Sequence, residues 1–249
     1  MFKLVLSDVD LLKNSIPIIA DIIDEGEFTF DQNGISLITP DRTMVSVVEL
    51  KILSAAFDEY TIDKPEKLGL NMANLSAVLK RAKSSDKLIL ESDKGDKLKI
   101  TIQGANTRTF EIPVIDIKTE NPPVEQLNFG GKAELETSVI EEGIADAEVI
   151  GDAVMLEMTD SGLKMAAKGD VSSTQLELKK GEAGLLSIKA SKPVKAQYPL
   201  DYLKKMIKAG KLSKQLILEM GTDYPMRLTF KNIDKLNLSF ILAPRVSED

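Results

Sequence analysis

The chain has 249 residues, enough for two domains that each bury a core of their own. It has no cysteine and no histidine, which excludes a disulfide framework, a thiolate nucleophile and the commonest general base and metal ligand. We therefore expect no metal site and no cofactor, and an enzyme is less expected. The net charge of −7 argues at first sight against nucleic acid, but binding depends on local basic stripes. No apolar run approaches the length of a membrane span, so we expect no membrane association.

The first elements follow from hydrophobic spacing. Alternating apolar residues predict a strand over 2–6. A helix is expected over 9–23, where apolar residues keep helical spacing across Pro17. Because proline lacks a backbone N–H, we also expect a kink near 13–17.

A hairpin follows in the sequence EFTFDQNGISLIT, whose Asn33–Gly34 pair supplies the positive φ angles of a tight turn. Further strands and one more helix complete this half of the chain. They are expected as a strand over 44–50, a helix over 71–83, two strands joined by a turn at Lys94–Gly95, and a strand over 107–115.

The second half of the chain repeats the first at a constant offset of 128 residues (161 minus 33). Three matches share this offset: NGISL at 33–37 with SGLKM at 161–165, DKLILE at 86–91 with KQLILE at 214–219, and LKITI at 98–102 with MRLTF at 226–230. A repeat this long indicates two copies of one domain. The second copy is expected to contain helices over 137–149 and 199–211 and strands over 173–179 and 235–242.

A linker is predicted between the copies. The segment 118–131, KTENPPVEQLNFGG, contains Pro122–Pro123 and a glycine pair and lacks strand alternation. We place an N-terminal domain at 1–117 and a C-terminal domain at 132–249. The predicted fold class is α+β, with two helices packed on antiparallel sheet in each domain.

Two of the predicted helices carry basic faces. The helix over 199–211 has lysines opposite its apolar side, and Asp201 is its only acid. The helix over 71–83 exposes Lys80, Arg81 and Lys83. A solvated face is the commoner explanation of such charges. The near absence of acidic partners weakens that explanation for 199–211.

The helix over 137–149 is acidic instead. It contains Glu141, Glu142, Asp146 and Glu148, and no basic residue lies between Lys132 and Lys164. Glu142 and Asp146 share a face, and like charges there disfavour the helix slightly. A solubilising face and a surface that meets cations elsewhere explain this pattern equally well.

Several motifs together resemble one family. They are GLNMANLSAVLK at 69–80, PPVEQLNF at 122–129, IGDAV at 150–154, GTDYPMRLTF at 221–230 and ILAPRVSED at 241–249. With the duplication, they resemble the archaeal and eukaryotic proliferating cell nuclear antigen (PCNA) family from the first strand to the last few residues. The acidic tail, the absence of cysteine and the basic cluster at 80–83 favour the archaeal branch.

The resemblance implies the DNA clamp fold and a ring of three identical chains, with helices lining a central hole. It implies a sliding clamp that encircles duplex DNA without reading its sequence and acts as a processivity factor in replication and repair. The implied partners are DNA polymerase, the clamp loader, flap endonuclease and DNA ligase, bound through short peptide motifs. The implied location is the archaeal cytoplasm, at the nucleoid.

The resemblance also assigns site residues. The DNA-facing set is Lys13, Lys80, Lys204, Lys205, Lys208 and Lys211. The partner-peptide groove is Met44, Val45, Val47, Leu127, Phe129, Pro225, Ile241, Ala243 and Pro244. At the subunit interface Arg81, Lys83 and Arg108 would face Glu142 and Asp146, while the strand over 107–115 would pair with 172–179 of the neighbouring chain. The position that matches Lys13 in the second copy is Glu141, which departs from an even basic lining.

Two other functions are alternatives to the clamp. A subunit of a heterotrimeric clamp, or a regulatory paralogue, would share the fold but differ in interface charges and in the tail groove. A duplicated-domain enzyme would need paired carboxylates or a glycine-rich phosphate loop. Asp8, Asp10 and Gly130–Gly131 are isolated and do not form such a cluster.

Overall fold

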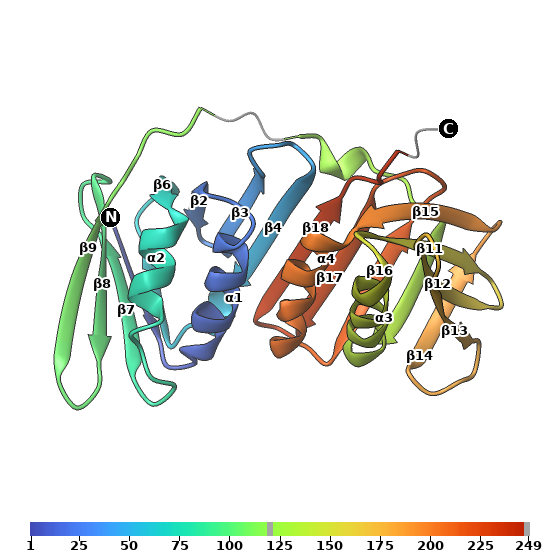
Figure 1. The fold of residues 1–249 in the computed structure, drawn as a ribbon. Helices are drawn as coiled ribbons and strands as arrows, with labels where there is room; N and C mark the ends of the chain where they lie inside the picture. The colour runs from blue at the N-terminus through green and yellow to red at the C-terminus, as the bar shows by residue number, and fades with distance from the viewer. Residues whose placement is uncertain (119–121, 247–249) are drawn as a thin grey trace. The chain divides into compact units, whose positions relative to one another are not determined.

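The computed structural model describes residues 1–118 and 122–246, and the chain divides into two compact units (Figure 1). Unit 1 comprises Met1–Pro122 and Asn232–Leu238, and unit 2 comprises Pro123–Lys231 and Ser239–Asp249. The division between Pro122 and Pro123 falls inside the predicted linker, and two others fall at 231/232 and 238/239. The domain boundaries at 117 and 132 stay a prediction.

Unit 1 contains two antiparallel sheets and two helices. One sheet has the order β5 (Glu59–Ile62), β1 (Phe2–Leu6), β7 (Lys87–Ser92), β8 (Lys97–Gln103) and β9 (Thr107–Pro113). The other strands follow the order β4 (Ser46–Leu53), β3 (Gly34–Pro40), β2 (Glu25–Asp31) and β6 (Glu66–Asn71). Helices α1 (Asp10–Ala20) and α2 (Met72–Leu79) lie side by side, and a short 3₁₀ turn, η1, spans Ser54–Ala56 (Figure 1).

Unit 2 repeats this plan. One set of strands has the order β14 (Leu185–Ala190), β10 (Gly131–Glu136), β16 (Gln215–Met220) and β17 (Met226–Asn232), and β18 (Leu236–Leu242) follows along the chain. The other sheet has the order β13 (Ser173–Lys179), β12 (Gly162–Lys168), β11 (Ala153–Thr159) and β15 (Val194–Pro199). Helix α3 (Thr137–Ile150) packs beside α4 (Leu200–Met206), which continues as the 3₁₀ helix η3 (Ile207–Lys211).

The duplication predicted from the sequence is confirmed by the strand bounds. Strands β2 and β11 begin at residues 25 and 153, which are 128 apart, and β3 and β12 begin at 34 and 162 with the same offset. The strand orders of the two units correspond element by element. The α+β fold of two helices and antiparallel sheets per unit is therefore the one expected.

Helix α1 runs through Pro17 without interruption, as the apolar spacing predicted. Ile16 and Ile19 are almost wholly buried on either side of the proline, so packing of the apolar face offsets the lost backbone hydrogen bond. The helix ends at Ala20, three residues earlier than expected. The kink near 13–17 stays a prediction.

The second helix of each unit is shorter than predicted. Helix α2 ends at Leu79 and is capped at its start by the Asn71 side chain, which accepts a hydrogen bond from Asn74 N at 2.9 Å. Lys80 to Lys83 therefore lie in and after the last turn, not on a helix face. Helix α4 gives way to η3 at Ile207, and Gly210 lies within η3.

The predicted linker is not uniformly extended. Its residues Val124–Gln126 form a single 3₁₀ turn, η2, and Val124 is buried. Strand β10 begins at Gly131, the last residue of the predicted linker. The composition predicted an extended linker, and the structure adds to it a 3₁₀ turn and a buried anchor at Val124.

Candidate functional site

Four of the basic residues predicted to be functional in unit 1 lie on its helices or directly after them. Lys13 lies on α1 and is half-buried, whereas Lys80 follows the last residue of α2 and is exposed. Arg81 and Lys83 are exposed in the turn after α2. The charged ends of these side chains can therefore reach an acidic partner from the surface of the unit.

In unit 2 the lysines of the second helix are not equivalent. Lys204 forms an ion pair with Glu148 of α3, and Nζ of Lys205 lies 5.5 Å from the centroid of the Tyr202 ring. Lys208 and Lys211 are exposed on η3. Lys204 and Lys205 are thus in contact with neighbouring side chains of the same unit.

The pairing of Glu148 with Lys204 was not predicted from the sequence. The two residues are 56 positions apart and come together because α3 and α4 pack side by side. The other three acids of α3, Glu141, Glu142 and Asp146, are exposed. Helix α3 therefore presents a negative surface, and Lys204 partly offsets the charge of one of its acids, Glu148.

The basic turn after α2 is fixed by a buried carboxylate. Asp86 is 7% exposed and accepts a hydrogen bond from Lys83 N at 2.9 Å. Its Oδ2 atom also lies 3.3 Å from Nη2 of Arg108 on β9. Nη1 of Arg108 donates to the carbonyl of Arg81 at 3.3 Å. The three predicted interface cations of unit 1 are thereby brought together around Asp86.

Each unit has a sheet that ends in a strand with one partner. Within residues 1–118 and 122–246, β9 pairs only with β8, and β13 pairs only with β12. Both strands leave apolar side chains half-buried, among them Phe110 on β9 and Leu176 and Leu178 on β13. Unpaired N–H and C=O groups on such an edge favour addition of a further strand.

The predicted groove residues divide between the units. Met44, Val45 and Val47 belong to unit 1, where Met44 has a φ of 59° and is 62% exposed. The other groove residues, Leu127, Phe129, Pro225, Ile241, Ala243 and Pro244, belong to unit 2. Val47 and Ile241 are buried, so these two contribute to the core of their units and not to a free surface.

An aromatic cluster in unit 2 holds the connector. The Phe129 ring meets the Tyr224 ring edge-on, with 6.0 Å between centroids. Cζ of Arg227 lies 5.3 Å from the Phe129 ring centroid, and Nη2 of Arg227 donates to the carbonyl of Val124 at 3.0 Å. The hydroxyl of buried Tyr198 donates to the Tyr224 carbonyl at 2.8 Å. Burial raises the pKa of Tyr198, so this donor stays protonated at neutral pH.

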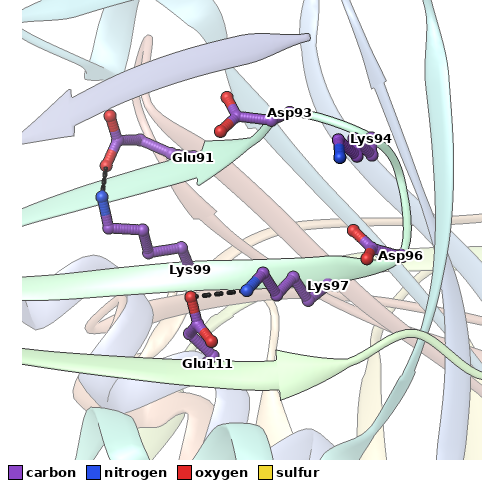
Figure 2. Close-up of a pocket in the computed structure, with 7 residues that line it drawn as sticks. All are labelled: Glu91, Asp93, Lys94, Asp96, Lys97, Lys99 and Glu111. Carbon is purple, nitrogen blue, oxygen red and sulfur yellow. Dashed lines mark ion pairs between the residues drawn. The ribbon is translucent and has the colours of Figure 1, made fainter.

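Unit 1 also contains a charged hollow that could in principle hold an active site. It has a volume of about 390 Å³ and is lined by Glu91, Asp93, Lys94, Asp96, Lys97, Lys99 and Glu111. Figure 2 shows Lys99 directed at Glu91 and Lys97 at Glu111, at 2.9 and 2.8 Å. Hydrogen bonds to these carboxylates raise the pKa of both lysines, so neither lysine can serve as a base at neutral pH.

The described residues offer neither a metal site nor a membrane-spanning helix. In 1–118 and 122–246, no group of three or more histidine, cysteine or acidic residues is placed to hold a metal ion. No helix in this part of the chain is long and apolar enough to cross a membrane.

Comparison with known proteins agrees with this architecture. Family models of the PCNA N-terminal and C-terminal domains match residues 1–121 and 125–245. A protein named DNA polymerase sliding clamp from Methanothermobacter thermautotrophicus is 34% identical, with 100% of each chain covered. One of the same name from Pyrococcus furiosus is 31% identical, with 99% of each covered. The crystal structure of PCNA from Thermococcus kodakaraensis superimposes with a TM-score of 0.92 at 24% identity, covering 98% of this chain and 100% of that one. The chain belongs to the proliferating cell nuclear antigen family.

Proposed function

We propose that this chain is a DNA sliding clamp, three copies of which close into a ring around duplex DNA and tether DNA polymerase to it. Two relatives named DNA polymerase sliding clamp align with this chain over 100% and 99% of their own length. The clamp acts without catalysis, by confining its partners to the duplex. The observation that carries the proposal is the pair of edge strands β9 and β13, which have opposite charges beside them.

The edges and charges support a head-to-tail assembly. Helix α2 and the basic turn around Asp86 lie beside β9, whereas the acidic helix α3 packs against β12 and β13. Pairing β9 of one chain with β13 of the next would bring Arg81, Lys83 and Arg108 toward Glu142 and Asp146. Because the two edges differ, the contact is heterologous, and it closes into a ring if the rotation between neighbours allows. A homotrimer uses both β9 and β13 of every chain.

The lysines support binding to phosphate. A clamp has to hold any sequence, so its contacts are to the DNA backbone and weaken with salt. Lys13, Lys80 and Lys211 are the DNA-facing residues that this proposal relies on most, and Lys208 is assigned to the same surface. Lys204 and Lys205 contribute less, because Glu148 and Tyr202 already engage them.

The partner site is proposed at the connector. Leu127 and Phe129 are half-exposed apolar side chains beside the charged and polar residues Glu125, Gln126 and Asn128. We infer that they receive short peptide motifs of DNA polymerase, the clamp loader, flap endonuclease and DNA ligase. Such partners place the protein on DNA in the cytoplasm, at the nucleoid.

Retention on closed DNA tests the proposal. The purified protein is incubated with a clamp loader, ATP and nicked circular duplex, and the mixture is separated by gel filtration at high salt. A ring stays with circular DNA after electrostatic contacts are screened, and it is lost when the circle is cut once. Equal loss from circular and linear DNA would contradict encirclement. Retention only after a second clamp-type chain is added would favour a heterotrimer.

A further inference from the structure

The connector that follows Pro123 is held on unit 2 at two points. Val124 is 5% exposed, and the Leu127 N–H donates to its carbonyl at 3.4 Å. Asn128 N donates to the Tyr224 hydroxyl, also at 3.4 Å. Between and after these points, Leu127 and Phe129 stay half-exposed. The backbone is therefore anchored while two apolar side chains remain accessible.

Arg227 of β17 joins both ends of this segment. Nη2 donates a 3.0 Å hydrogen bond to the Val124 carbonyl, 103 positions away in the sequence. The same guanidinium lies 5.3 Å from the Phe129 ring centroid, within the range of a cation–π contact. One planar group thus fixes the backbone at the start of the segment and a ring at its end.

The remaining supports come from β15 and from the loop that precedes β17. Tyr224 meets the Phe129 ring edge-on and accepts from the Asn128 N–H. Its own carbonyl accepts from the Tyr198 hydroxyl on β15 at 2.8 Å. Tyr198 is fully buried, so this chain of contacts ends in the core of unit 2.

We propose that Arg227 is a positioning residue for partner binding, which holds the connector in the conformation that presents Leu127 and Phe129 to an apolar peptide. This inference depends on the proposed peptide site. A loop that is ordered before binding loses less conformational entropy when the peptide binds, and affinity rises accordingly. Removal of Arg227 then weakens peptide binding although Arg227 need not contact the peptide.

Lysine cannot replace arginine fully at this position. A guanidinium is planar and can stack on an aromatic ring while its N–H groups donate, in the guanidinium plane, to a carbonyl. A lysine ammonium is a compact charge on a flexible stem and has no such plane. Arg227→Lys should therefore keep part of the attraction to Phe129 and lose the simultaneous bond to Val124.

The first experiment measures hydrogen exchange by mass spectrometry in the wild-type chain, Arg227→Ala, Arg227→Lys and the control Lys189→Ala. Lys189 is an exposed residue of β14 whose removal also takes one positive charge from unit 2. Amides over 126–129 should exchange about tenfold faster in Arg227→Ala and about threefold faster in Arg227→Lys. Exchange in β16 should not change. Unchanged exchange over 126–129 in both variants would overturn the proposal, and faster exchange throughout unit 2 would show a general loss of folding instead.

The second experiment measures the anisotropy of a fluorescein-labelled peptide from the clamp-binding tail of an archaeal replicative DNA polymerase. We expect the dissociation constant to rise about tenfold in Arg227→Ala and about threefold in Arg227→Lys, with Lys189→Ala as wild type. A loosened connector with undiminished peptide affinity would overturn the positioning role. Failure of the wild-type chain to bind the peptide would instead refute the proposed peptide site, and the exchange data would then judge the Arg227 contacts separately.

Discussion

The two copies of the domain share a fold and differ in charge. Helix α1 carries Lys13 where α3, 128 residues later, carries Glu141. The buried positions of both copies are mainly apolar, and the two copies have the same strand order. After a duplication, packing constrains the interior of both copies alike, whereas exposed positions can diverge. The difference therefore shows which surface of each copy has acquired a role of its own.

The copies also differ at their sheet edges. Strand β9 of unit 1 lies beside the basic turn that Asp86 fixes, and β13 of unit 2 lies beside acidic α3. Two β9 edges would repel each other, as would two β13 edges, whereas β9 and β13 would attract. Such charges select head-to-tail pairing of β9 with β13. In the proposed ring, divergence of charge between the copies would give an assembly direction to a chain whose halves are otherwise alike.

The largest effect on stability is expected at matching turn glycines of the two copies, Gly34 and Gly162, which differ in the backbone angle φ. Gly34 has a φ of +142°, and a Cβ there would lie 1.9 Å from the Ile52 carbonyl oxygen. At the matching Gly162 the nearest atom, the Leu178 carbonyl oxygen, is 2.4 Å away, and its φ lies outside the left-handed region. Gly34→Ala should lower the free energy of unfolding by about 3 kcal/mol, and Gly162→Ala by about 1.5 kcal/mol. Urea denaturation measures both, and an equal loss would contradict the distinction.

A change outside both sheets should leave the ring intact and abolish partner binding. Leu127 is half-exposed on the connector, so Leu127→Ser removes apolar surface without opening a core. Stimulation of the replicative polymerase in primer extension should fall to about a tenth or less. Ser138→Ala, an exposed change on α3, is the control. Undiminished stimulation by Leu127→Ser, at unchanged oligomer mass, would refute the groove assignment.

Reversal of one charge beside either edge should weaken the trimer. Arg81→Glu places an acid in the basic turn, and Asp146→Lys places a base on α3, so each creates like-charge contacts at every interface of the ring. Trimer dissociation should shift to about tenfold higher protein concentration, read from molar mass in solution. The double variant should recover most of the loss. Unchanged mass in either single variant over the dilution series would contradict the interface.

The smallest effect concerns the acidic helix of unit 2. Glu148→Gln breaks the ion pair with Lys204 and removes one negative charge near the DNA-facing lysines. Affinity for duplex DNA should rise about two- to threefold, and the dependence on salt should steepen. Glu157→Gln, on β11, changes the net charge equally at another site. An equal rise in both variants would assign the effect to net charge and not to the release of Lys204.

The sequence predicted the elements whose signals are local. The Asn33–Gly34 turn and the alternation of the strands flanking it predicted the β2–β3 hairpin. The lengths of α2 and α4 were overestimated because the basic residues continue the apparent periodicity past the point where the backbone leaves the α-helix. Side-chain charge on a helix end says little about where the hydrogen bonding stops.

The contacts that organise the site could not be predicted, because they join distant positions. Asp86 meets Arg108 across 22 positions, and Arg227 meets Val124 across 103. A carboxylate before a strand and an arginine within one are ordinary features of a sequence. Only the fold shows that Asp86 is buried and that the guanidinium of Arg227 lies by the Phe129 ring.

The molar mass of the wild-type protein in solution tests the central claim most directly. Light scattering coupled to gel filtration, at low and at high salt, should give three times the mass of one chain in both buffers. Strand pairing between β9 and β13 should hold the ring together when salt screens the charges. A stable mass of one chain at both salt concentrations would contradict a ring built from this chain alone.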